Sequence, residues 1–208
     1  MGVTAQTFNY MNRWLKDSHK SICELGDQQF SCCPPFPELS YTKTYFKNKG
    51  LEYDSIDLNG YGQSLMLDLN EDIDHNKQYD FVTDFGTMEH IEDFYMGWKN
   101  MDKLCKISGI MIHVIPALNR WDNHGSWRAP MKFFIKLGKA QKYKIWDLHT
   151  ESTAISPGHP PNDQVYLVYE KTKEMEFIDR ETFDSFGPVL AYPIEKYEVG
   201  KLGGGRTF

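Results

Sequence analysis

The chain of 208 residues is long enough for one domain with a complete hydrophobic core. Its formal net charge of -6 disfavours functions that depend on nucleic acid, because contacts with phosphates require Lys and Arg. No apolar run is long enough to cross a bilayer and no signal pattern begins the chain, so we expect no membrane contact. The four cysteines contain no Cys-x-x-Cys pair, which favours the reducing cytoplasm.

The spacing of apolar residues predicts helices and strands in alternation. We expect residues 1–19 to form an amphipathic helix with Phe8, Met11 and Trp14 on one side. It serves either as a packing helix or as a lid over a pocket. Further helices are expected at 38–48, after residue 86, and from 130 to about 141. Strands are expected at residues 21–26, 51–57, 64–69, 79–85, 110–115, 143–150 and 164–171.

The stretch from Tyr79 to Ile91 organises this pattern. An apolar strand ends there in the turn Asp84-Phe85-Gly86-Thr87, and the hydroxyl of Thr87 can cap the helix that follows. In an open α/β sheet, ligands bind beyond the carboxyl ends of the strands, where such turns lie. We therefore expect this turn to line a site.

The order of elements predicts the α/β fold class, with a mostly parallel sheet and helices on both faces. The helix at 1–19 precedes the expected domain, which covers residues 20–172. The segment 173–208 loses periodicity and ends in Gly203-Gly204-Gly205 and three further residues. We expect it to be a loose tail or an arm on another subunit, which leaves a homodimer open.

Short motifs at the ends of the first four strands carry a family resemblance. They are Glu24-Leu25-Gly26, Asp57, Asp68-Leu69 and Asp84-Phe85-Gly86. With the terminal strand pair they resemble the class I S-adenosylmethionine-dependent methyltransferases over residues 20–172. The resemblance implies a Rossmann-like sheet of seven strands whose last strand is antiparallel, and S-adenosyl-L-methionine as the cofactor.

The resemblance also implies roles for single residues. Asp57 is expected to accept from the ribose hydroxyls, and Asp68 and the amide of Leu69 to bind the adenine edge. The turn at 84–86 is expected to close on the methionine part of the cofactor. An alternative for Asp68 is that it only caps a turn.

The first motif departs from the family pattern, because no second glycine follows Gly26. Gln28 could replace a backbone contact with the cofactor by a side-chain one. Glu24 is either a cofactor ligand or a partner for helix amides within the fold.

The loop after the strand at 110–115 supplies most candidates for acceptor binding and catalysis. His124 is the candidate general base, and Trp121 and Trp127 could stack on a ring or a sugar. Arg128 could hold an anionic acceptor. His90, beside the expected helix start, is the second catalytic candidate. The alternatives are a surface histidine at 124 and a capping or packing role at 90.

Asp72, Asp74 and His75 lie close together in the sequence and carry side chains that can bind a metal ion. Their spacing matches no standard zinc or calcium pattern, so a solvated loop is favoured and no metal is predicted.

The resemblance and these residues together predict a methyltransferase that acts on an oxygen of a small-molecule acceptor with a histidine base. The alternative is a catalytically silent methyltransferase-like domain that binds a protein partner, which the missing glycine and the Pro-rich stretch at 34–37 would suit. A nicotinamide-dependent oxidoreductase is disfavoured, because Gly-x-Gly-x-x-Gly is absent.

Overall fold

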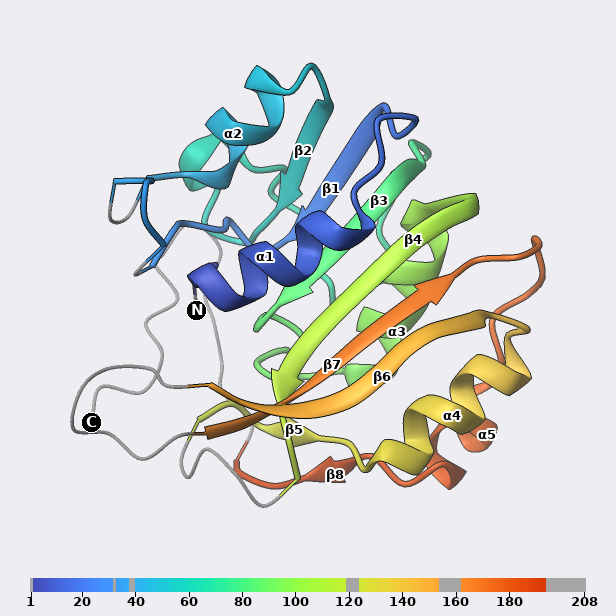
Figure 1. Cartoon of the computed structure of the whole chain (residues 1–208). Coiled ribbons are helices and arrows are strands. Elements are labelled where there is room, and N and C mark those ends of the chain that lie inside the picture. Colours follow the sequence, from blue (N-terminus) through green and yellow to red (C-terminus); the bar gives the residue numbers. More distant parts are fainter. Residues whose placement is uncertain (1, 32, 38–39, 119–123, 154–161, 194–208) are drawn as a thin grey trace.

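The computed structural model describes residues 2–31, 33–37, 40–118, 124–153 and 162–193 (Figure 1). Within these residues the main sheet has six strands in the order β2-β1-β3-β4-β7-β6. The strands are β1 (Ser21–Leu25), β2 (Glu52–Ile56), β3 (Tyr79–Phe85), β4 (Cys105–Pro116), β6 (Lys144–Thr153) and β7 (Asn162–Glu170). The first four run parallel, and β7 lies antiparallel between β4 and β6. The predicted α/β class and antiparallel last strand of the main sheet are confirmed.

Helices cover both faces of this sheet, as predicted. Figure 1 shows α1 (Ala5–Trp14) in front of the strands, and α2 (Thr42–Asn48) contributes Phe46 to the same apolar layer. The opposite layer takes Trp98 from α3 (Phe94–Leu104) and Leu137 from α4 (Met131–Ala140). Every residue of β1 is buried, as expected for a parallel strand covered on both faces.

The predicted strand at 64–69 is wrong, so the described sheet has six strands instead of seven. Only an isolated bridge joins Leu65 to Ile56, after a single turn of 3-10 helix, η1 (Tyr61–Gln63). Beyond Leu65 the chain leaves the sheet, because Leu69 packs in the core beneath α3. The Asn100 side chain of α3 donates to the Leu69 carbonyl at 3.0 Å.

The helix after β3 begins later than predicted. Asp93, rather than Thr87, caps α3, and its carboxylate accepts from the Met96 amide at 3.1 Å. The Thr87 hydroxyl instead donates to the carbonyl of Leu25 at the end of β1, at 2.8 Å. The irregular segment between Gly86 and Asp93 is thereby fastened to the neighbouring strand.

The prediction of a loose tail is wrong for residues 173–193. This part contains α5 (Arg180–Ser185), whose Phe183 is completely buried in the core layer of α3 and α4. It also contains β8 (Val189–Leu190), which pairs with β5 (Trp127–Arg128). Residues 194–208, with the glycine run, lie outside the described residues. Within the described residues, no helix has the length and apolar character needed to span a membrane.

Candidate functional site

The parallel strands β1 to β4 end at one edge of the sheet, and part of the predicted site residues lies in the turns beyond it. Gly26 follows β1 with a φ of 81°, a conformation that favours glycine. A Cβ at this position would overlap the Thr87 hydroxyl. The Gln28 side chain folds back on the same turn and donates to the Leu25 carbonyl at 3.0 Å. The side chains of Gln28 and Thr87 therefore pack against Gly26 and hold the turn after β1 through hydrogen bonds to the Leu25 carbonyl.

Asp57 follows β2 and lies against this turn. One of its carboxylate oxygens accepts from the Asp27 amide at 2.9 Å, and the other accepts from the Asn59 amide at 3.0 Å. Burial, and then the charge of Asp57, raise the pKa of Asp27 to about 6. The Asp27 and Asp57 carboxylates thus lie close enough to interact where β1 and β2 end.

Glu24 faces away from this turn, toward α2. Its carboxylate accepts from the hydroxyl of Tyr53 at 2.6 Å and from the hydroxyl of Thr42, the first residue of α2. Burial raises the pKa of Glu24 to about 7, although both hydrogen bonds oppose this change. Glu24 therefore contacts other parts of the fold, which is the second of the two roles predicted for it. Its partners are side-chain hydroxyls instead of helix amides.

Asp68 and Asp84 both bind nearby backbone amides. Asp68 accepts from the Asn70 backbone amide at 2.9 Å and caps its own turn. Asp84 is fully buried, accepts from the Thr87 amide at 2.9 Å, and pairs through its second oxygen with the His113 imidazole. Leu69 and Phe85 are core residues on opposite faces of the sheet, and Gly86 has a φ of 86°.

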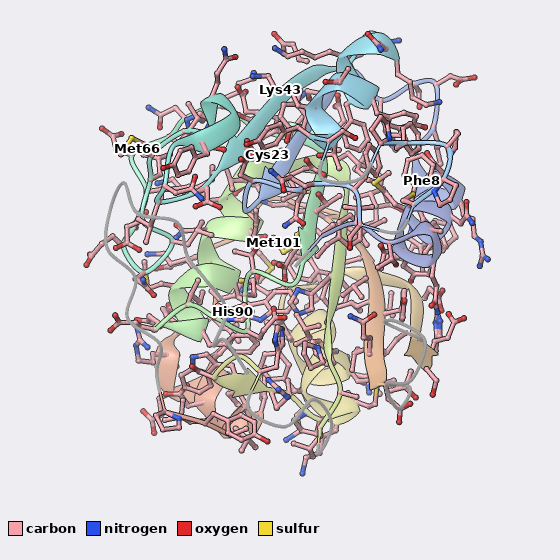
Figure 2. All side chains as sticks on the ribbon, turned by 90° about the vertical axis from the view of Figure 1, so that its left-hand side faces the viewer. Phe8, Cys23, Lys43, Met66, His90 and Met101 are labelled. Carbon is pink, nitrogen blue, oxygen red and sulfur yellow. The ribbon has the colours of Figure 1, made fainter. Side chains whose placement is uncertain are left out.

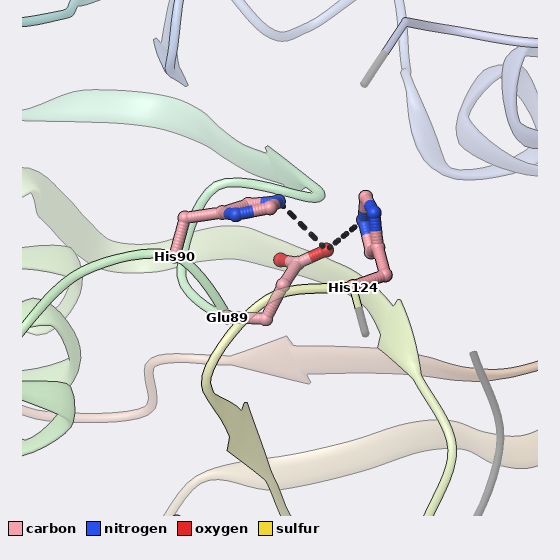
Figure 3. Close-up of side chains that lie close together, drawn as sticks. All are labelled: Glu89, His90 and His124. Atoms are coloured by element: carbon pink, nitrogen blue, oxygen red, sulfur yellow. Dashed lines mark ion pairs between the residues drawn. The ribbon is translucent and has the colours of Figure 1, made fainter. Parts of the chain in front are cut away.

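The two histidines predicted to be catalytic lie together, with a glutamate between them. His90 and His124 approach edge to face, with ring centroids 4.8 Å apart. The Nε2 atoms of His90 and His124 lie 3.8 and 3.6 Å from the same oxygen of Glu89 (Figure 3). His90 and His124 are slightly exposed, whereas Glu89 is fully buried. Figure 2 labels His90 in its place on the whole molecule.

The backbone of Glu89 holds the loop that carries His124. The amides of Ser126 and Trp127 both donate to the Glu89 carbonyl, at 2.6 and 3.1 Å. Gly125 has a φ of 64°, and a Cβ there would lie 2.6 Å from the Glu89 Cγ. The side chain of Glu89 therefore fills the space in which a larger residue at 125 would sit.

Glu89 is a buried carboxylate beside two imidazoles. Neither of its oxygens has a hydrogen-bond partner within the described residues. Burial acts to raise the pKa of Glu89, but the imidazoles of His124 and His90 outweigh it and hold that pKa below its usual range. The carboxylate is therefore negatively charged at neutral pH.

Of the three predicted acceptor-binding residues, Trp127 and Arg128 lie within the described residues, and both contact other parts of the protein. Trp127 stacks on Phe94 at 5.6 Å between ring centroids and donates from its indole to the Ile91 carbonyl at 3.0 Å. Arg128 is buried and donates to the carbonyls of Trp127 and His124, so it braces the loop. Trp121 lies outside the described residues.

No family model and no curated protein matches this sequence. Solved structures do match. A methyltransferase described as S-adenosylmethionine-dependent, from Methanosarcina mazei, aligns with 79% of this chain and 98% of its own, at a TM-score of 0.58 and 10% identity. StiE O-MT aligns with 87% of this chain and 77% of its own, at a TM-score of 0.56 and 12% identity.

A third match was solved with a cofactor product and an acceptor. The 1,6-didemethyltoxoflavin-N1-methyltransferase of Burkholderia thailandensis, with bound 1,6-didemethyltoxoflavin and S-adenosylhomocysteine, aligns with 79% of this chain and 76% of its own, at a TM-score of 0.55 and 11% identity. The chain has the class I methyltransferase fold. The sequence resemblance thus predicted this methyltransferase fold correctly.

Glu89 is the residue of this site that the sequence did not single out. The adjacent Glu89-His90 pair at the end of a strand, with His124 in the loop after the next strand of the sheet, is the signal that could have found it.

Proposed function

We propose that this methyltransferase-fold protein transfers a methyl group from S-adenosyl-L-methionine to an oxygen of a small molecule. The observation that carries the proposal is the position of Asp57, at the carboxyl end of β2 and against the turn after β1. In open α/β sheets this edge is where nucleotide ligands bind. The methyltransferase of the same fold with bound S-adenosylhomocysteine supports this choice of cofactor.

The residues at this edge fit the cofactor chemically. Each oxygen of Asp57 accepts one backbone amide, and carboxylate oxygens have further lone pairs for two ribose hydroxyls. The side-chain oxygen of Gln28 is buried and has no hydrogen-bond partner within the described residues, so it could accept from the ammonium group of a methionine moiety. When bound, S-adenosyl-L-methionine supplies a methyl group on a sulfonium centre.

The acceptor is proposed to bind at Glu89, His90 and His124, which follow β3 and β4 at the same edge. Methyl transfer to a hydroxyl requires that the hydroxyl lose its proton. The sequence proposes His124 as the group that takes this proton. The net charge of -6 favours a small metabolite over nucleic acid.

The test is calorimetric titration with S-adenosylmethionine and S-adenosylhomocysteine, with NADH as the nucleotide control. We expect micromolar binding of the first two and none of NADH. Asp57→Asn, which keeps one acceptor oxygen, should weaken binding at least about tenfold, as expected for losing a charge-assisted hydrogen bond. The control is Asp74→Ala in an exposed position. If neither compound binds the wild-type protein, the proposal fails and the silent, partner-binding domain becomes the better explanation.

A further inference from the structure

Glu89, His90 and His124 form a set of metal-binding side chains that the sequence pattern did not assemble. Each offers one ligand atom, and the three atoms lie within 4.8 Å of one another. Figure 3 shows both rings directed at one carboxylate oxygen from its two sides. The three residues come from two separate loops, after β3 and after β4.

We propose that Glu89, His90 and His124 bind a divalent transition-metal ion. Two imidazole nitrogens and one carboxylate oxygen suit Zn²⁺, Fe²⁺, Mn²⁺ or Co²⁺, whereas Mg²⁺ and Ca²⁺ prefer oxygen ligands alone. The candidate ligands that lie close together in the sequence, at residues 72–75, do not form this site. In that segment Asp72 instead pairs with Lys99 and Lys103, each at 2.9 Å.

The spacing of the three side chains fits one shared ion. Ligand atoms about 2.1 Å from a tetrahedral ion lie about 3.4 Å from one another. The two histidine nitrogens lie 3.8 and 3.6 Å from the Glu89 oxygen, too far for hydrogen bonds and close to that separation. All three ligand atoms lie within 4.8 Å of one another, so rotations of the side chains would bring them to one ion.

The burial of Glu89 gives an independent reason for a cation here. A carboxylate removed from water is costly unless charges or hydrogen bonds compensate it. Its two oxygens are buried and accept no hydrogen bond within the described residues. The two imidazoles compensate this charge only when they are protonated, whereas a divalent ion would compensate it with both rings neutral.

The backbone that carries the three ligands is also held in place before any ion binds. The Glu89 carbonyl accepts from the amides of Ser126 and Trp127, and Arg128 donates to the carbonyl of His124. Gly125 lets the loop pass directly against the Glu89 side chain. Rigid support of this kind is what a metal site needs, because ligands must be positioned within a few tenths of an ångström.

The histidine side of the site is less buried than the carboxylate. The side chains of His90 and His124 are 12% and 15% exposed, whereas the side chain of Glu89 is fully buried. Three protein ligands leave a coordination position for an external oxygen. This part of the inference rests on the proposed function: the open position would take the acceptor oxygen, and His124 would act as a ligand instead of as the general base.

The experiment is titration of the chelator-treated full-length protein with Co²⁺, followed by visible absorption, with Zn²⁺ as the competitor. We expect one Co²⁺ per chain and its displacement by Zn²⁺. His90→Asn and His124→Asn should each weaken Co²⁺ binding by more than about tenfold, because each removes one of three protein ligands. Glu89→Gln should do the same if circular dichroism shows that it folds. If Glu89→Gln does not fold, the His90→Asn variant provides the test, because His90 is slightly exposed.

The matched control is His149→Asn. His149 also lies beside two carboxylates, with Asp147 at 3.0 Å and Glu151 at 3.6 Å, but on β6 and more exposed. It should leave Co²⁺ binding unchanged. The proposal is overturned if Co²⁺ does not bind, if His90→Asn and His124→Asn bind it as the wild type does, or if only His149→Asn weakens it.

Binding of S-adenosylhomocysteine in chelator separates this inference from the proposed function. If it binds while Co²⁺ does not, the metal site fails and the methyltransferase proposal stands. If Co²⁺ binds at these residues while S-adenosylhomocysteine does not bind with or without Co²⁺, the metal site stands and the methyltransferase proposal fails.

Discussion

Replacing Glu24 by Gln should change how the stability of the fold depends on pH. Glu24 is fully buried between β1 and α2, and its hydrogen bonds come from the hydroxyls of Thr42 and Tyr53. A Gln at this position has nearly the same shape and can still accept from these hydroxyls, but it never ionises. The substitution therefore removes the titration and keeps most of the packing.

The sign follows from the raised pKa of Glu24, about 7 in the folded protein against 4.5 in an unperturbed glutamate. The folded state binds this proton more tightly than the unfolded state does. Its stabilising contribution is therefore complete below about pH 4.5 and is lost as the pH rises to about 7. At about 1.4 kcal/mol for each pH unit between the two pKa values, the loss amounts to about 3 kcal/mol.

The assay is urea unfolding of both proteins between pH 4.5 and pH 8. We expect the free energy of unfolding of Glu24→Gln, minus that of the wild type, to increase by about 3 kcal/mol across this range. Asp27 also titrates here, since its pKa is raised to about 6, but it is present in both proteins and largely cancels in the difference. A difference that does not change with pH would refute the reasoning, because Glu24 would then ionise equally in both states.

Two further predictions concern the loops and the C-terminal segment. Gly125→Ala should destabilise the protein more than Gly50→Ala, because both glycines have positive φ but only a Cβ at 125 would overlap Glu89. Equal losses in thermal unfolding would contradict the close contact. Phe183→Ala should cost about 3–5 kcal/mol, as for other buried phenylalanines, whereas Val189→Ala in an exposed position should cost less than about 0.5 kcal/mol. A small effect at Phe183 in urea unfolding would show that α5 is not part of the core.

The fold class could be predicted from the amino-acid sequence, because each element carries its own pattern of apolar residues. Apolar runs such as that of β4 identify strands covered on both faces, and the spacing of Trp98 and Met101 identifies the buried side of α3. The periodicity of apolar residues did not predict reliably where each helix and strand begins and ends. The segment around Leu69 has the apolar content of a strand, yet its burial under α3 prevents pairing beyond Leu65.

The contacts between polar side chains could not be predicted from the sequence, because they depend on how the elements pack together. His90 and His124 each had a surface or packing role as an alternative, and nothing in their local sequence shows that they share Glu89. Their meeting depends on the parallel pairing of β3 with β4, which brings the two following loops to one edge. The contact between the two histidines also depends on β8, since this strand pairs with β5 at the end of the loop that carries His124. Such contacts join residues far apart in the chain, and local patterns encode which face of an element is buried but not its partner.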